Sequence, residues 1–176
     1  MAAIPITVQR RIWTPSSGGR LWVIVIPRGQ VLTIERFEGD GMHTAAVTPT
    51  RVGIYKVDAS RNGSGGTPAT TDIITTIHDL AQPSVTPASA LPAGISGSWG
   101  VNQGDYTTPP TINAADLMHV VSVQPYGGNN CWPPDGRPIA FHNLQAGDMQ
   151  LAFVGMSDTG TQANGVEWRL HALAGV

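Results

Sequence analysis

The sequence predicts one all-β domain, an antiparallel β-sandwich of jelly-roll type with about eight strands and long ordered loops. Three observations predict this class: short segments alternate apolar and polar residues, Gly and Pro punctuate the chain between them, and helical signals are nearly absent. No sequence repeat recurs at a fixed period, which disfavours propellers and solenoids. The 176 residues suit a single domain that spans residues 1–176.

The expected strands follow from this alternation and from β-branched composition. Residues 4–12 place Ile4, Ile6, Val8 and Ile12 on one side of a strand. Residues 21–26 are apolar throughout, which indicates a central strand covered on both faces. The other expected strands are residues 31–37, 52–57, 71–77, 117–124, 149–156 and 166–173.

Two local features refine this pattern. The tight connection at residues 27–30 predicts a β-hairpin between the strands at 21–26 and 31–37. Residues 114–119 have the composition of a single helical turn.

Two long stretches, at about residues 81–113 and 125–148, do not follow the strand pattern. Residues 81–104 contain no charged residue and are rich in Pro, Ala, Ser and Gly. Long loops are uncommon and are usually functional or disordered, and large apolar residues favour order only when they are buried. We therefore expect ordered loops or arms that are held by the domain or by neighbouring proteins. The residues expected at such an interface are Ile4, Leu91, Ile95, Trp99, Val101, Tyr126 and Trp132.

The tryptophans divide into strand and loop positions. Trp22 and Trp168 lie in expected strands and are predicted to be core residues. Trp99 and Trp132 lie in the long stretches and have two interpretations. They are either exposed residues that anchor a protein or stack on a sugar ring, or side chains that plug the ends of the sandwich.

Charge is scarce in this chain. Charged residues make up 12%, the formal net charge is −2, and Lys56 is the single lysine. The sequence therefore has neither a basic footprint for nucleic acid nor a polybasic segment for anionic lipid, and neither partner is expected. Residues 21–26 are too few to span a bilayer, and no export signal is expected. A charge-poor surface favours burial against other proteins.

No motif for catalysis, metal binding or a cofactor is recognisable, so the protein is expected not to be an enzyme. Ser96 and Ser157 each lack the final glycine of Gly-x-Ser-x-Gly, and Cys131 has no neighbouring base or cation to activate it. The five histidines do not occur at His-x-His or His-x-x-x-His spacing, and they are His43, His78, His119, His142 and His171. A β-scaffold could still gather histidines in space, so a small cupin-like enzyme stays an alternative.

Residues 4–15 (IPITVQRRIWTP) and the strands at 21–26 and 31–37 resemble small β-sandwich virion proteins of tailed bacteriophages, which include capsid decoration, or cement, proteins. The likeness covers about the first 60 residues. It implies a structural subunit of the virion, assembled in the host cytoplasm, that binds the outside of an assembled head. The implied partners are the major capsid protein or other virion proteins, and the implied oligomer is a trimer.

By this interpretation the contacts with the particle come from residues 1–6, 81–104 and 125–148. A tail or baseplate position is an open alternative. A second alternative is a carbohydrate- or receptor-binding module, because β-sandwiches commonly host such sites.

Overall fold

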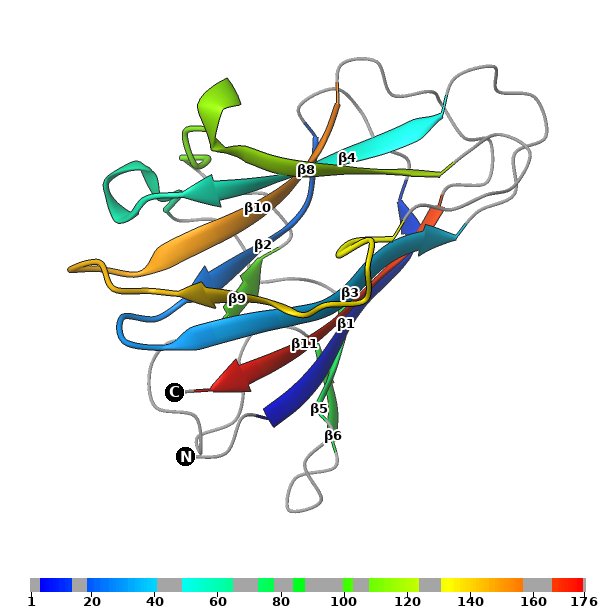
Figure 1. Ribbon diagram of the computed structural model, residues 1–176, viewed down its shortest axis with the longest axis horizontal. Helices are drawn as coiled ribbons and strands as arrows, with labels where there is room; N and C mark the ends of the chain where they lie inside the picture. The colour runs from blue at the N-terminus through cyan, green and yellow to red at the C-terminus, as the bar shows by residue number, and fades with distance from the viewer. Residues whose placement is uncertain are drawn as a thin grey trace.

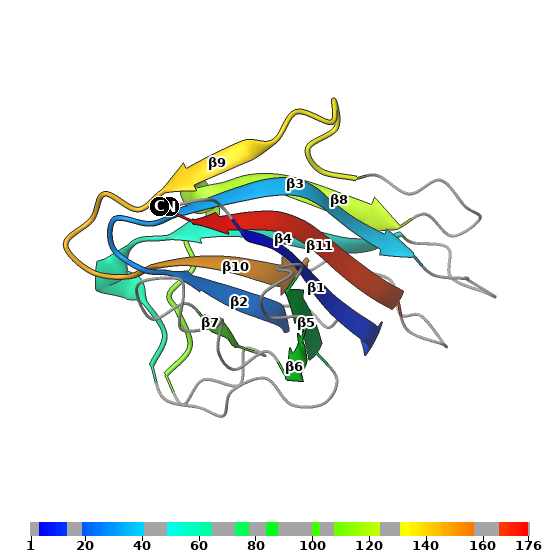
Figure 2. The same cartoon turned by 90° about the horizontal axis from the view of Figure 1, so that it is seen from below.

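The computed structural model describes residues 4–13, 19–40, 49–64, 73–77, 84–87, 100–102, 108–123, 131–156 and 166–175. These residues form two antiparallel sheets that face each other (Figures 1 and 2). The six-stranded sheet contains, in spatial order, β6 (Ser84–Pro87), β5 (Ile73–Ile77), β1 (Ile4–Trp13), β11 (Val166–Gly175), β3 (Val31–Asp40) and β9 (Ile139–His142). The five-stranded sheet contains β7 (Gly100–Asn102), β2 (Arg20–Ile26), β10 (Met149–Gly155), β4 (Thr50–Val57) and β8 (Leu117–Val123).

The prediction of an all-β sandwich is confirmed. Each of the eight expected strands is present, and the helical turn expected near residue 114 is the short 3-10 helix η2 (Ala114–Asp116). A second 3-10 helix, η1 (Ala59–Arg61), follows β4. Three further short strands, β6, β7 and β9, lie inside the two stretches that were expected to be loops.

The predicted hairpin between β2 and β3 is wrong. These strands belong to different sheets: β2 pairs with β10 and β7, whereas β3 pairs with β11 and β9. The turn between them is tight, with a bond of 3.1 Å from the Gln30 amide to the Pro27 carbonyl and with Gly29 at a φ of 76°. A tight turn reverses the chain but does not decide which strand pairs with which. Here the chain crosses between the sheets at the turn, and the Gly29 amide and the Gln30 carbonyl bond to the backbone of Asn143 at 2.9 and 3.0 Å.

An aromatic cluster joins the two sheets across the core. Phe37 and Trp168 come from the six-stranded sheet, Trp22 and Phe153 come from the five-stranded sheet, and all four are fully buried. Phe37 lies at the centre, with ring centroids 4.8 Å from Phe153, 5.3 Å from Trp168 and 5.9 Å from Trp22. The burial of both tryptophans confirms their prediction as core residues.

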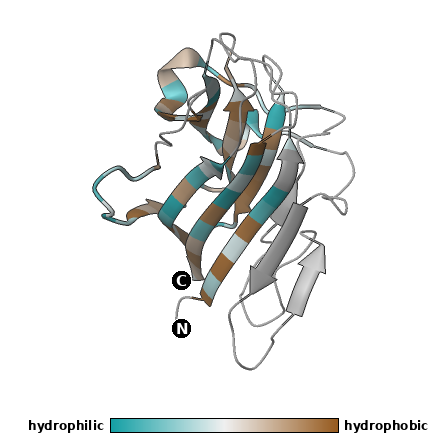
Figure 3. Cartoon of the chain, turned by 90° about the vertical axis from the view of Figure 1, so that its right-hand side faces the viewer, coloured by the Kyte–Doolittle hydropathy of each residue, from teal (hydrophilic) through white to brown (hydrophobic). Residues whose placement is uncertain are grey.

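β2 is covered on both faces, as its unbroken apolar run predicts. Trp22 and Ile24 face the main core, whereas Val23 belongs to a second buried cluster with Val57, Ala152 and Val154. Tyr55 and Ile112 pack against this second cluster. The six-stranded sheet differs from β2 in this respect. Polar and apolar residues alternate along its strands, so its inner face is buried and its outer face is more exposed (Figure 3).

Candidate interaction surface

The loop between β9 and β10, residues 143–148, forms a firmly held tip at one end of the sandwich (Figure 1). Asn143 is fully buried, and its Nδ2 donates to the carbonyls of Ile26 at 2.7 Å and Gly147 at 3.0 Å. Its Oδ1 accepts a bond of 3.1 Å from the Gln145 amide. A buried side chain with three bonds to the backbone fixes the loop in one conformation.

Leu144 projects from this tip into solvent. It is 88% exposed, and no other large hydrophobic residue among the described residues is exposed. Its neighbours on both sides, Asn143 and Gln145, are tied to the body of the domain, so the backbone of Leu144 is held while its side chain is free. An apolar side chain held in place before binding loses little conformational entropy when a partner covers it.

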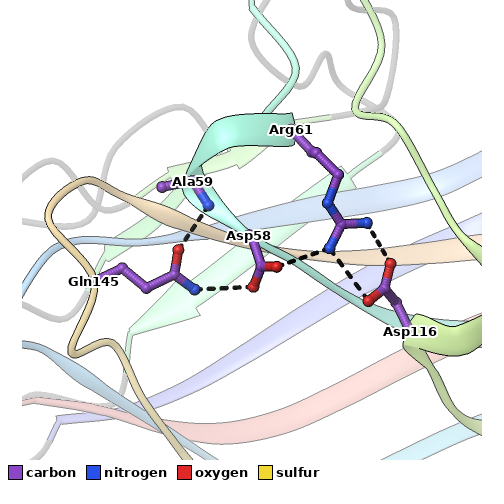
Figure 4. A network of polar contacts seen from close by, with 5 residues as sticks. All are labelled: Asp58, Ala59, Arg61, Asp116 and Gln145. Atoms are coloured by element: carbon purple, nitrogen blue, oxygen red, sulfur yellow. Dashed lines mark hydrogen bonds and ion pairs between the residues drawn. The ribbon is translucent and has the colours of Figure 1, made fainter.

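A polar network connects the tip to the end of β4 (Figure 4). The Gln145 side chain accepts a bond of 2.8 Å from the Ala59 amide and donates to Asp58 at 3.1 Å. The other oxygen of Asp58 accepts a bond of 2.9 Å from Arg61. Arg61 also binds both carboxylate oxygens of Asp116, so one guanidinium joins η1 to η2.

The electrostatics of this network favour its charged forms. Hydrogen bonding from Arg61 is the main cause that holds the pKa of Asp116 below the usual range of an aspartate. Hydrogen bonding to Asp116 and then to Asp58 raises the pKa of Arg61 above its ordinary value. Bidentate contact gives this pair a defined geometry, which isolated surface ion pairs lack.

We expect Arg61→Met to loosen the contact between η1 and η2, because both carboxylates would lose their shared donor. Hydrogen exchange should then become faster at Thr111 and Asp116, whose amides bond to the carbonyls of Arg61 and Asn113. Arg36→Met is the matched control, since it removes an exposed ion pair with Glu38 on the outer face of the six-stranded sheet. Equal exchange in the two variants would contradict a structural role for the network.

Two chain segments, residues 61–64 and 108–111, meet beside this network and are called the neck here. The Ser64 amide bonds to the Thr108 carbonyl at 2.9 Å, and the Thr108 amide bonds back at 3.0 Å. The Thr111 amide adds a bond of 3.0 Å to the Arg61 carbonyl. The intervening residues 65–107, called the insertion here, therefore leave and rejoin the domain at one place.

The insertion contributes strands to both sheets. β5 pairs with the free edge of β1, β6 pairs with β5, and β7 pairs with the edge of β2 (Figures 1 and 2). The insertion lies within a longer stretch that has only acidic charges: residues 62–136 contain five aspartates and no lysine or arginine. Asp116, which lies in this acidic stretch, is paired with Arg61, the last cation before it.

Of the residues expected at an interface, the three that the structure describes lie in different places. Ile4 is half-buried, packs against the main core and pairs with Ala174. Val101 lies in β7 of the other sheet, opposite Ile24. Trp132 is buried near β3. The four others lie outside the described residues, and they are Leu91, Ile95, Trp99 and Tyr126.

Trp132 plugs the sandwich, which excludes it as an exposed anchor in this structure. Its side chain is 5% exposed, and its backbone amide and carbonyl pair with those of Phe37 at 2.9 and 2.7 Å. The ring stacks on His119 with centroids 5.9 Å apart and lies 6.1 Å from Phe141. Of the two interpretations that the sequence leaves open for Trp132, the structure shows the side chain that plugs the sandwich and not the exposed anchor.

We expect stability to depend on pH through His119, the half-buried ring that stacks on Trp132. Burial lowers the pKa of this half-buried histidine below its ordinary value of 6.5. Between the two pKa values the unfolded chain binds a proton that the folded chain does not, so the free energy of unfolding falls as pH falls below 6.5. His119→Phe keeps a stacked ring and should flatten this dependence in urea unfolding between about pH 8 and about pH 5. An unchanged slope in the variant would exclude His119 as its source.

The outer face of the six-stranded sheet carries side chains that are already paired. Glu167 accepts bonds of 2.7 Å from both Gln9 and Arg169, and Arg36 binds Glu38 at 2.6 Å. A shallow hollow of about 120 Å³ is lined by Glu38, Gly39, Asp40, Glu167 and Arg169. Pockets for small molecules are typically about 300–1,000 Å³, so this hollow is too small to be a typical small-molecule binding site.

Sequence reasoning missed the residues that build the tip and the network. Leu144 and Gln145 fall within the stretch 125–148, but nothing in their local sequence marks one as exposed and the other as bonded. The available signal was the i, i+3 spacing of Asp58 and Arg61, which suits an ion pair in a helical turn.

Comparisons with family models, with curated proteins and with solved structures find no match for this chain. Among the described residues, no helix has the length and hydropathy needed to cross a membrane. Within the same parts of the chain, no three His, Cys, Asp or Glu side chains cluster as metal ligands.

Proposed function

We propose that this protein is a non-enzymatic structural subunit of a viral particle, specifically a decoration protein that binds and stabilises the head of a tailed bacteriophage. The observation that carries the proposal is Leu144, an exposed apolar side chain on a backbone held by the bonds of Asn143 and Gln145. An apolar side chain on a backbone that is already fixed loses little conformational entropy when a partner covers it, which supports a docking role for this residue. The partner in this proposal is the major capsid protein or another virion protein, and a trimer is the favoured oligomer.

The strand order supports a jelly roll as the finer class of fold. Without β5, β6 and β7, the two sheets read β1-β11-β3-β9 and β2-β10-β4-β8. Each of the first four strands then lies in the sheet opposite to its predecessor, which is the alternation expected when a double Greek key folds into two four-stranded sheets. The insertion falls between the fourth and fifth strands of this pattern.

The proposed mechanism is stabilisation by selective binding. A subunit that binds the assembled, expanded lattice and not its precursor favours that lattice by mass action. Several weak contacts per oligomer add through multivalency, so no single contact needs to be strong. In this proposal the tip supplies one contact, and residues 1–6, 81–104 and the described part of 125–148 supply the others.

The proposal is tested by sedimentation with expanded heads of candidate phages, after light scattering has given the mass of the free protein. We expect the wild type to pellet with the heads and Leu144→Asp to lose most binding. Leu144→Ala should weaken binding by about tenfold or more, since burying a leucine is worth roughly 1.5–3 kcal/mol. Ala114→Asp, at an exposed position of η2 outside the segments assigned to the contacts, is the control for an added charge.

Two outcomes would reject the proposal. One is a folded wild-type protein that stays in the supernatant with every expanded head. The other is equal pelleting of Leu144→Asp and Ala114→Asp, which would remove the tip from the interface.

A further inference from the structure

The neck contains a reactive dipeptide, Asn62–Gly63. In an open chain the backbone nitrogen of a glycine can attack the side-chain amide carbon of a preceding asparagine, because glycine has no side chain in the way. The new N–Cγ bond forms a succinimide ring, the Cγ–Nδ2 bond breaks, and ammonia leaves with the glycine proton. Water then opens the ring and leaves aspartate or isoaspartate, with no change of oxidation state.

Both reacting groups are held in hydrogen bonds in the closed neck. The Gly63 amide donates to Oε1 of Gln150 at 2.9 Å, and the Gly63 carbonyl accepts from Nε2 of Gln150 at 3.2 Å. The Asn62 Nδ2 donates to the Asp148 carbonyl at 2.5 Å. Gln150 is 4% exposed and lies within β10, so this clamp is built on the core of the five-stranded sheet.

The glycine cannot be exchanged for a residue that blocks the reaction without disturbing the neck. A Cβ at Gly63 would lie 2.6 Å from Cδ of Pro110 and 2.8 Å from its backbone nitrogen. Such distances are far inside van der Waals contact, so the neck requires glycine here. The close approach of the two segments therefore requires a glycine after Asn62, and this glycine makes Asn62 prone to deamidation.

We propose that Asn62 is a deamidation site whose reaction the closed neck slows, and that conversion of Asn62 permanently loosens the neck. An opening of the neck frees the Gly63 nitrogen and permits the reaction. The product replaces the Nδ2 donor by a carboxylate oxygen that faces the Asp148 carbonyl. Asn62 Oδ1 is already buried with no hydrogen bond from the described residues, so the carboxylate would gain no donor from the partners that the amide now has.

The consequence reaches the insertion. Reclosing the neck would bring a carboxylate oxygen against the Asp148 carbonyl, where the amide had placed its donor. Isoaspartate would also lengthen the backbone next to the Ser64–Thr108 pair and displace its two hydrogen bonds. One opening that lasts long enough for the reaction thus becomes irreversible.

Peptide mass spectrometry in ¹⁸O-labelled water at mildly alkaline pH tests the first half of the proposal. The chain has one other Asn–Gly pair, Asn164–Gly165, which reports the chemistry in urea-unfolded protein. In the unfolded chain we expect Asn62 to deamidate at the same rate as Asn164. In the folded wild type we expect Asn62 to deamidate at least about tenfold more slowly, because the reaction then requires local opening. Folded Gln150→Leu should approach the unfolded rate. Equal rates in folded and unfolded wild type, or a Gln150→Leu variant as slow as the folded wild type, would overturn the proposal.

Hydrogen exchange of Asn62→Asp tests the second half and does not depend on the Gln150 variant. We expect loss of protection at the amides of Ser64, Thr108 and Thr111, which form the bonds of the neck. Asn62→Ala removes the donor without adding charge and should lose less protection. An Asn62→Asp protein with wild-type protection at these three amides would show that deamidation does not loosen the neck.

Discussion

Replacing Phe37 by alanine is expected to lower the free energy of unfolding by about 3–5 kcal/mol. Phe37 is fully buried and is the ring that contacts Trp22, Phe153 and Trp168 together. Its removal leaves a cavity between the two sheets and breaks three aromatic contacts at once. For a domain of this size the unfolding midpoint should fall by roughly 10 °C.

Urea unfolding followed by near-ultraviolet circular dichroism measures this effect, because the signal arises from the tryptophans that pack against Phe37. Leu144→Ala is the matched control: it also truncates a large apolar residue, but one that is 88% exposed, and it should change stability by less than about 0.5 kcal/mol. A Phe37→Ala variant within about 1 kcal/mol of the wild type would mean that the cluster does not join the sheets as described.

The long strands could be predicted because their signal is local. In β11 the alternation of Trp168 and Leu170 with Arg169 and His171 is complete within the strand, and burial follows it. β6, β7 and β9 have only three or four residues, too few for alternation to be distinguished from loop composition. Their existence depends on the edges of β5, β2 and β3, which no local pattern reports.

Strand pairing and the candidate surface could not be predicted because they depend on distant contacts. The turn at residues 27–30 is compatible with a hairpin, but β2 pairs with β10 and β3 pairs with β11, strands that come more than 100 residues later in the chain. Asn143 bonds to Ile26, 117 positions away, and Gln150 bonds to Gly63, 87 positions away. An amide side chain has no local pattern that identifies a backbone partner so far along the chain, so these residues resemble ordinary loop or strand polar residues.

Replacing Asn143 by alanine is expected to give the second-largest loss of stability, at least about 1–3 kcal/mol. The alanine leaves the carbonyl of Ile26 without its donor at a buried position and frees the carbonyl of Gly147. Buried polar groups that lose their partner cost the full desolvation penalty. Asn143→Asp keeps the acceptor for the Gln145 amide but turns a charged oxygen toward both carbonyls, so it should destabilise at least as much.

Thermal unfolding gives the stability of both variants, and hydrogen exchange at the Gly29 amide reports the tip directly, because that amide bonds to the Asn143 backbone carbonyl. We expect faster exchange at Gly29 in each variant at temperatures where the core is still folded.

The same variants separate preorganisation from contact in the proposed function. Asn143 is fully buried and touches no partner, yet its loss should weaken binding to phage heads by releasing the backbone of Leu144. Wild-type exchange at Gly29 together with wild-type stability in Asn143→Ala would exclude Asn143 as the residue that holds the tip.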